Sequence, residues 1–184
     1  MLNQFIVLGS IKQKFDNQIL LQTNEHGNLR LTGKDVFDDL IDGNVYGFKG
    51  HIETDKDGIQ LVVEKTTSID SDDMEKFRDL SSTILVGKRV EASGNTWTLE
   101  LINDKRQSSR VNVFGKDSFM DEINKQIQDN ADIVGIKGTI LEENGTNQIE
   151  IEKVSVLTAR QDFRHDQESI QEQEGVGDAI IQES

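Results

Sequence analysis

Apolar and polar residues alternate in short runs along most of this chain. Val111 and Val113 alternate with arginine and asparagine, and isoleucine alternates with glutamate over residues 149–152. A period of two residues is typical of β-strands that bury one face. Apolar residues spaced three and four apart occur within residues 36–41 and 119–127, which predicts two short helices. The pattern therefore predicts a mostly β protein with short helices.

Residues 5–69 and 83–157 repeat one pattern in the same order. FIVLGSI corresponds to TILVGKRV, LRLTGKD to VNVFGKD, and VYGFKGHI to IVGIKGTI. The segments 47–64 and 135–152, which follow the last of these matches, have equal lengths. Asp-Gly in the first copy and Asn-Gly in the second predict hairpin turns between the last two strands. Self-similarity of this extent indicates an internal duplication.

Each copy is predicted to contain three strands, a short helix and two further strands. This is the order of the five-stranded oligonucleotide-binding barrel, the OB-fold. We therefore expect an all-β chain with short helices, organised as two tandem OB-fold barrels. The predicted parts are an N-terminal barrel, an acidic linker, a C-terminal barrel and a disordered acidic tail, at residues 1–69, 70–82, 83–157 and 158–184.

Composition excludes several kinds of site. The chain has no cysteine, which excludes disulfides and thiolate metal sites, and its three histidines are scattered. No GxxxxGK[ST] phosphate loop occurs, so we expect a non-enzymatic protein without a metal or a cofactor. The apolar run near the N-terminus spans four residues, and none reaches about 18 residues, so neither a signal peptide nor a membrane span is predicted. The expected location is the cytoplasm.

Three segments of the second copy follow one another in a recognisable order: NTWTLEL (95–101), VNVFGKD (111–117) and IVGIKGTILEENGTNQIEIEKVSVL (133–157). Together they resemble the bacterial and phage single-stranded DNA-binding protein family. The resemblance covers roughly residues 83–157. It implies a protein that coats single-stranded DNA in replication, recombination and repair, in a bacterial cell or a phage-infected host. Because family members usually gather four barrels, it also implies a homodimer of this two-barrel chain.

The family also carries an acidic tail that recruits replication and repair proteins. This chain has an acidic C-terminal segment, which implies replication or recombination proteins as partners. Its last residues are GDAIIQES, however, where the family usually ends in aspartates followed by Pro-Phe. Masking of the barrels by the tail, or contact with another partner, therefore stays open.

A formal net charge of −14 is unusual for a DNA-binding protein, because phosphate contacts need lysine and arginine. The tail carries −5, the linker −3 and each barrel −3, so more than half of the excess lies outside the barrels. Residues 83–116 hold six bases and three acids. Since strands 2 and 3 and the adjacent loops form the usual binding surface of this fold, we expect a cationic groove there. The predicted contacts are Lys88, Arg89, Lys105, Arg106, Arg110 and Lys116, with Lys12 and Lys14 in the first copy.

Phe114 is the strongest single candidate for contact with a base. In this strand, Arg110 and Phe114 fall on one face and the two alternating valines fall on the other. If the valines face the core, the ring of Phe114 should point away from it. An outward ring beside arginines can stack on a base, a contact worth about 1–3 kcal/mol. The family resemblance also places a base-stacking residue at this position. The equivalent residue in the first copy is Thr32, so that barrel lacks the stacker. The alternative is that Phe114 packs under the helix or between barrels.

The other aromatic residues are better explained as core. Trp97 falls on the same face of its strand as Leu99 and Leu101, which predicts a buried indole. Tyr46 and Phe48 share one face of a strand and are predicted to be core or dimer contacts rather than base stackers.

A protein-binding adaptor is the alternative function. Its barrels would bind protein, and its acidic tail would imitate nucleic acid; the net −3 of each barrel favours this reading. A preference for RNA over DNA also stays open, since OB-fold barrels bind either polymer.

Overall fold

The computed structural model describes residues 3–24, 26–56, 58–70, 80–102, 109–127 and 132–157. The first half of the chain forms the strands β1 (Gln4–Lys14), β2 (Gln18–Gln22), β3 (Asn28–Thr32), β4 (Val45–Asp55) and β5 (Gly58–Ser68). The second half forms β6 (Ser81–Ser93), β7 (Thr96–Leu101), β8 (Ser109–Phe114), the helix α1 (Asp117–Gln126), β9 (Ile133–Glu143) and β10 (Thr146–Val156). The predicted all-β class is therefore confirmed.

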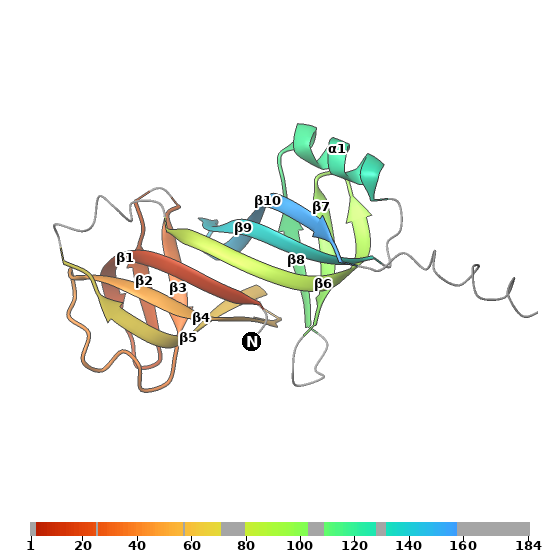
Figure 1. Cartoon of the computed structure of the whole chain (residues 1–184). Coiled ribbons are helices and arrows are strands. Elements are labelled where there is room, and N and C mark those ends of the chain that lie inside the picture. Colours follow the sequence, from red (N-terminus) through yellow and green to blue (C-terminus); the bar gives the residue numbers. More distant parts are fainter. Residues whose placement is uncertain are drawn as a thin grey trace, which may run out of the picture.

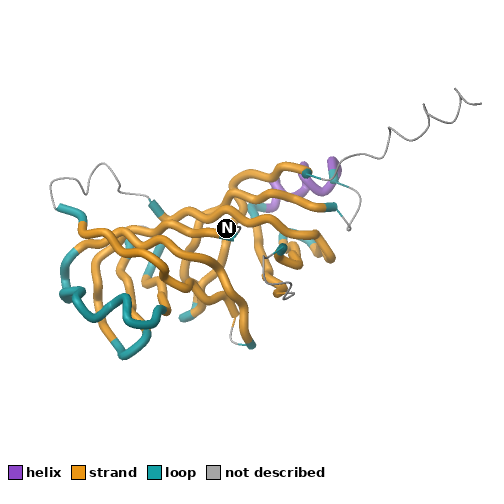
Figure 2. The backbone as a smooth tube through the Cα atoms, turned by 60° about the horizontal axis from the view of Figure 1, so that its bottom comes forward, coloured by secondary structure: helices purple, strands orange, loops and turns teal. Residues whose placement is uncertain are grey.

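Each half closes into a five-stranded barrel. In the first half, β1 pairs with both β2 and β4, and β3 closes the barrel by a short parallel pairing with β5. In the second half, β6 pairs with both β7 and β9, and β8 pairs in parallel with β10. This is the strand order of the OB-fold. Figure 1 shows the two barrels side by side, and Figure 2 shows α1 at the far end of the second one.

The same irregularities recur in both barrels. A β-bulge leaves Glu64 as the extra residue of β5, and an equivalent bulge leaves Glu152 as the extra residue of β10. A glycine lies opposite each bulge, Gly50 on β4 and Gly138 on β9. A Cβ atom at Gly50 would lie 1.9 Å from the carbonyl oxygen of Val62, and one at Gly138 would approach β10 similarly. The recurrence of these glycines thus follows from the close approach of two backbones.

The two barrels share one continuous sheet through an antiparallel pairing of β1 with β6. Phe5 lies opposite Thr83, and these residues occupy equivalent positions of the repeat. The pair Gln4–Ile84 is likewise the counterpart of the pair Ile6–Ser82. The pairing therefore has the symmetry of an isologous contact, with a pseudo-two-fold axis through Phe5 and Thr83.

Asn3 fixes this junction. Its backbone has a φ of 59°, a left-handed conformation that asparagine tolerates better than most residues. Its side chain donates a hydrogen bond to the carbonyl oxygen of Ile102 at 2.8 Å and accepts one from the amide of Val86 at 2.9 Å. Its own carbonyl oxygen accepts a hydrogen bond from the amide of Ile52 at 2.9 Å. One buried residue thus ties β4 of the first barrel to β6 of the second.

Trp97, Tyr46 and Phe48 belong to the buried core, as their parity predicts. The rings of Tyr46 and Phe48 lie 6.2 Å apart, centre to centre, within the geometry of aromatic pairs. Their contact forms part of the core of the first barrel.

The helix expected within residues 36–41 does not form. Turns occupy this segment, with a hydrogen bond from the amide of Leu40 to the carbonyl oxygen of Phe37. Phe37 is buried, but Ile41 is 62% exposed, so the expected apolar face is absent. Six residues are too few to sustain a helix without packing along a full face. In the second barrel the prediction is confirmed, because α1 has ten residues and buries Met120.

The strand β6 begins at Ser81, inside the range expected as linker. Residues 71–79 of that linker and the tail from residue 158 lie outside the described residues.

Candidate nucleic-acid interface

The outward face of β7 and β8 presents polar residues and one aromatic ring. Phe114 lies opposite Thr96, Asn112 opposite Thr98, and Arg110 opposite Glu100. The intervening residues of both strands are buried. Phe114 is half-buried and shares the outward side with exposed Arg110, so the orientation expected from its parity is confirmed.

Phe114 and Arg110 lie in a groove at the junction of the barrels. The groove has a volume of about 790 Å³, within the usual range of ligand sites. One wall is the outward side of β8, a second is the β9–β10 hairpin, and the third is the β4–β5 hairpin of the first barrel. The lining residues that bear on binding are Lys56, Arg110, Asn112 and Phe114, and Ile59 and Asn147 complete the lining where the barrels meet. Both barrels therefore build one site.

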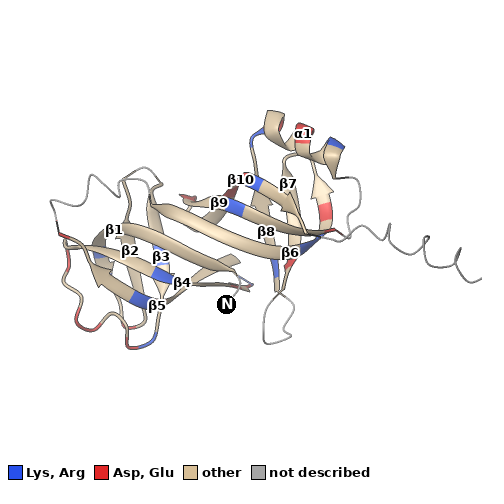
Figure 3. Cartoon of the chain, viewed as in Figure 1, with Lys and Arg blue, Asp and Glu red and all other residues tan. Residues whose placement is uncertain are grey.

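The charges of this groove are balanced. Lys56 and Arg110 belong to different walls, and the same lining includes Asp55 and Glu143. Both cations are exposed, which leaves their charges available to a phosphate backbone but screened by solvent. The groove thus combines two cations with a ring, rather than forming a strongly basic channel. Figure 3 shows that acidic and basic positions are interspersed along the ribbon of the chain.

Lys88 belongs to the same outward surface. It lies opposite Glu100 on β7, and Glu100 lies opposite Arg110 on β8. An acid therefore separates these two bases across three neighbouring strands, which moderates the cationic character expected here.

Lys116 follows β8 and remains exposed. Its ammonium lies 3.9 Å from a carboxylate oxygen of Glu150, with side-chain exposures of 82% and 27%. A pair at this distance whose lysine is open to solvent contributes little to stability, so Lys116 keeps the freedom to contact a ligand near Phe114.

The prediction that Arg89 contacts nucleic acid is wrong. The strand β6 continues to Ser93, so Arg89 lies inside the strand, with the inward parity, and is 1% exposed. Its guanidinium lies 4.9 Å from the centre of the Trp97 ring and donates a hydrogen bond to the carbonyl oxygen of Ile127 at 2.9 Å. Arg89 therefore joins the core to the C-terminal end of α1.

Lys12 and Lys14 lie away from the groove, towards the end of β1 that is remote from the β1–β6 pairing. Lys12 is exposed and is the extra residue of a β-bulge. The ammonium of Lys14 donates hydrogen bonds to the carbonyl oxygens of Asp38 and Leu40 at 2.9 and 3.0 Å. Lys14 thus holds the loop after β3, and the structure does not bring either lysine to Phe114.

Lys105 and Arg106, also expected as contacts, lie outside the described residues. Sequence reasoning missed Lys56, which comes from the other barrel. Its position in the turn before Gly58, between the last two strands, is the signal that could have identified it, because the strand 4–5 loop often binds ligands in this fold.

Away from the groove, Glu152 carries a perturbed carboxyl. The hydroxyl of Thr139 donates a hydrogen bond to it, which lowers the pKa of Glu152 below its ordinary value. Partial burial opposes this shift, and the ammonium of Lys137, 3.4 Å away, reinforces it.

Among the described residues, no group of three or more His, Cys, Asp or Glu side chains could hold a metal ion. No helix within the same residues is long and apolar enough to cross a membrane.

No protein family model matches this sequence, and no curated protein matches it. Among solved structures, the wild-type single-stranded DNA-binding protein from Thermus aquaticus matches with a TM-score of 0.65 at 15% identity, over 86% of this chain and 94% of that one. A deletion variant of the same protein gives an equal TM-score and covers 96% of its own chain. The mitochondrial protein Rim1 from S. cerevisiae covers 44% of this chain with a TM-score of 0.37. Because the Thermus match spans 86% of the chain, it includes both barrels, and this chain has the fold of that single-stranded DNA-binding protein.

Proposed function

We propose that this chain binds single-stranded DNA without strong sequence preference and coats it during replication or recombination. The observation that carries the proposal is the groove at the junction of the barrels, where Phe114 stands on the outward side of β8. The second and third strands of an OB-fold are its usual oligonucleotide surface. The fold shared with the Thermus protein supports the same proposal.

Binding would combine stacking with backbone electrostatics. A base stacks on the exposed face of Phe114, while Arg110 and Lys56 contact phosphates from different walls. Stacking tolerates any base, because every base has a π-face. Since each phosphate contact releases counterions, affinity falls as salt rises, with a log–log slope of about −0.7 per contact for single strands.

Fluorescence anisotropy of labelled oligo-dT tests the proposal. We expect binding at low salt that weakens as salt rises, and a loss of affinity in Phe114→Ala. The matched control is Phe15→Ala, since Phe15 is 51% exposed and lies outside the groove. Absence of binding at low salt would refute the proposal, and stronger binding of oligo-U would assign the groove to RNA instead.

The balanced charge of the groove favours a second candidate, an adaptor that binds protein. Two acids line the groove beside two cations, a pattern that suits a mixed protein surface as well as a phosphate backbone. The DNA proposal ranks first because the outward aromatic ring of Phe114 can stack on a base. The salt titration of oligo-dT binding separates the two.

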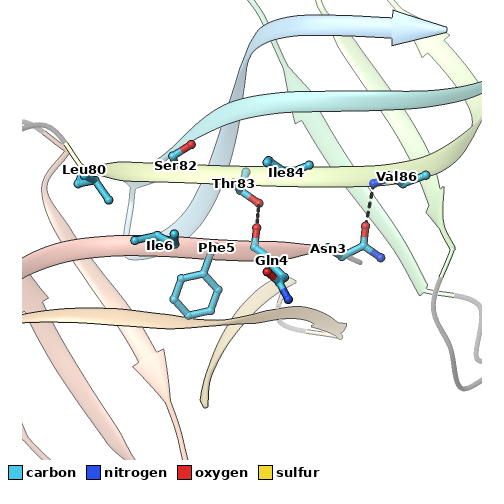
Figure 4. A pocket seen from close by; sticks show the side chains of 9 residues that line it. All are labelled: Asn3, Gln4, Phe5, Ile6, Leu80, Ser82, Thr83, Ile84 and Val86. Carbon is cyan, nitrogen blue, oxygen red and sulfur yellow. Dashed lines mark hydrogen bonds between the residues drawn. The ribbon is translucent and has the colours of Figure 1, made fainter. Parts of the chain in front are cut away.

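We further propose that the chain acts as a homodimer, joined through the outward face of β1 and β6. Ile6 and Ile84, which are equivalent under the pseudo-two-fold axis, are 43% and 61% exposed there, and a cavity of about 400 Å³ adjoins them (Figure 4). Burial of such a patch by a second copy would remove apolar surface from water. Light scattering of Ile6→Lys combined with Ile84→Lys should give a monomer of 20.7 kDa. The control Ile41→Lys, at an exposed isoleucine elsewhere, should leave the dimer intact.

A further inference from the structure

The duplication implies two equivalent grooves, one on each barrel. Thr32 pairs in parallel with Val62, as Phe114 pairs with Glu150, so Thr32 and Phe114 are structural equivalents. Two residues earlier, on the same outward side, Arg30 is the equivalent of Asn112. If both barrels bound a strand in the same way, the backbone at Arg30 would line a second groove.

That position is instead occupied by the second barrel. The side-chain amide of Asn147 donates a hydrogen bond to the carbonyl oxygen of Arg30 at 2.9 Å, and its oxygen accepts one from the amide of Arg30 at 3.2 Å. The Asn147 amide also lies 3.3 Å from the carbonyl oxygen of Ile59, to which it donates. A single side chain thereby contacts β3 and β5 of the first barrel, where these strands diverge beyond their short pairing.

A second contact joins the β9–β10 hairpin, which carries Asn147, to the first barrel. The amide of Glu142 donates a hydrogen bond to the carbonyl oxygen of His26 at 3.0 Å, in the loop between β2 and β3. Gly27 lies against the Glu142 side chain, so close that a Cβ atom there would come within 3.1 Å of a carboxylate oxygen. The β9–β10 hairpin therefore contacts the first barrel at two places, Arg30 and the loop at His26.

The reciprocal contact cannot form. The spacing that pairs Gly50 with Gly138 also makes Ile59 the equivalent of Asn147. Isoleucine has neither a donor nor an acceptor in its side chain, so it cannot bond the backbone of Asn112 as Asn147 bonds that of Arg30. At this place the structure has the open groove, lined by both Ile59 and Asn112.

We propose that each chain offers one strand-binding groove, at β8, and that Asn147 closes the equivalent place at β3. This inference rests on the proposed function and deepens it: the first barrel contributes the β4–β5 hairpin with Lys56 to the neighbouring groove rather than a groove of its own. Its lack of an aromatic ring at Thr32 fits that role.

The test is the number of short oligonucleotides bound per chain, measured by native mass spectrometry and titration calorimetry at low salt. The probe is oligo-dT of about eight nucleotides, within the site size of one barrel. We expect one oligonucleotide per chain in the wild type and also in Thr32→Phe, because the new ring would face a closed position. Combining Thr32→Phe with Asn147→Ala should open the position and give two.

The outcomes separate the two ideas. Two oligonucleotides per wild-type chain would support DNA binding and overturn the single groove. One oligonucleotide in the double variant, with hydrogen exchange showing that the amide of Arg30 has lost its protection, would overturn the role of Asn147. No binding in any variant would overturn the proposed function itself. The variant Asn147→Asp, which keeps an acceptor but loses the donor, should leave the Arg30 amide partly protected.

Discussion

Phe114→Ala is the most informative single change. The ring is half-buried, with its outward side in the groove, so it offers one face to one base. Stacking of a base on an aromatic ring is worth about 1–3 kcal/mol. Because part of the ring is already covered, we place the loss in the lower part of that range, about 1–2 kcal/mol. At 1.4 kcal/mol per factor of ten, the dissociation constant should rise about 5- to 30-fold.

The assay is anisotropy of labelled oligo-dT at fixed low salt, with thermal unfolding of each variant measured in parallel. Phe114→Trp should retain binding, since it keeps an aromatic face, whereas Phe114→Leu should lose about as much as Phe114→Ala. Phe15→Ala removes an exposed ring outside the groove and should bind like the wild type. If Phe114→Ala binds within twofold of the wild type while remaining folded, the stacking role is refuted. An equal loss in Phe15→Ala would refute the location.

Three further predictions address charge, core and pH. Arg110→Ala and Lys56→Ala should each lower the log–log salt slope of oligo-dT binding by about 0.7, equally for oligo-dA; an unchanged slope would exclude phosphate contacts at these residues. Arg89→Met should destabilise the protein by about 2–4 kcal/mol in urea unfolding, because it removes a buried donor, while the DNA affinity of the folded protein stays unchanged. Unchanged stability with a loss of DNA affinity would show instead that Arg89 contacts DNA. Thr139→Val should raise the pKa of Glu152, as followed by carboxyl NMR, because the lowering hydrogen bond is gone. In the wild type, stability from ionised Glu152 is present above its unfolded pKa and is lost as pH falls through the lower folded value, so the variant should lose less stability on acidification.

Periodicity and duplication are sufficient to predict the two barrels, because each strand buries one face and the glycines opposite the bulges of β5 and β10 recur in both copies. The outward position of Phe114 follows from the same alternation. Parity also places Trp97 in the core. These features depend on local sequence, where the physical signal is strongest.

The errors arise where long-range contacts override the local pattern. Arg89 was expected to contact nucleic acid, yet β6 runs through it to Ser93 and turns it inward, where the Trp97 ring and a backbone carbonyl group accommodate its charge. Residues 36–41 have helical spacing, but the ammonium of Lys14 stabilises turns there instead. Lys56 reaches the groove only because the two barrels dock, and no periodicity within one barrel reports that docking.

We propose that single-stranded DNA occupies the groove built by both barrels. Backbone amide NMR during titration with short oligo-dT locates the ligand on the folded chain. We predict the largest shifts at Lys56, Asn112 and Phe114, with little change at Lys12 and Lys14. Shifts concentrated on the outer end of β1, with those three groove residues unaffected, would show that DNA does not occupy the groove.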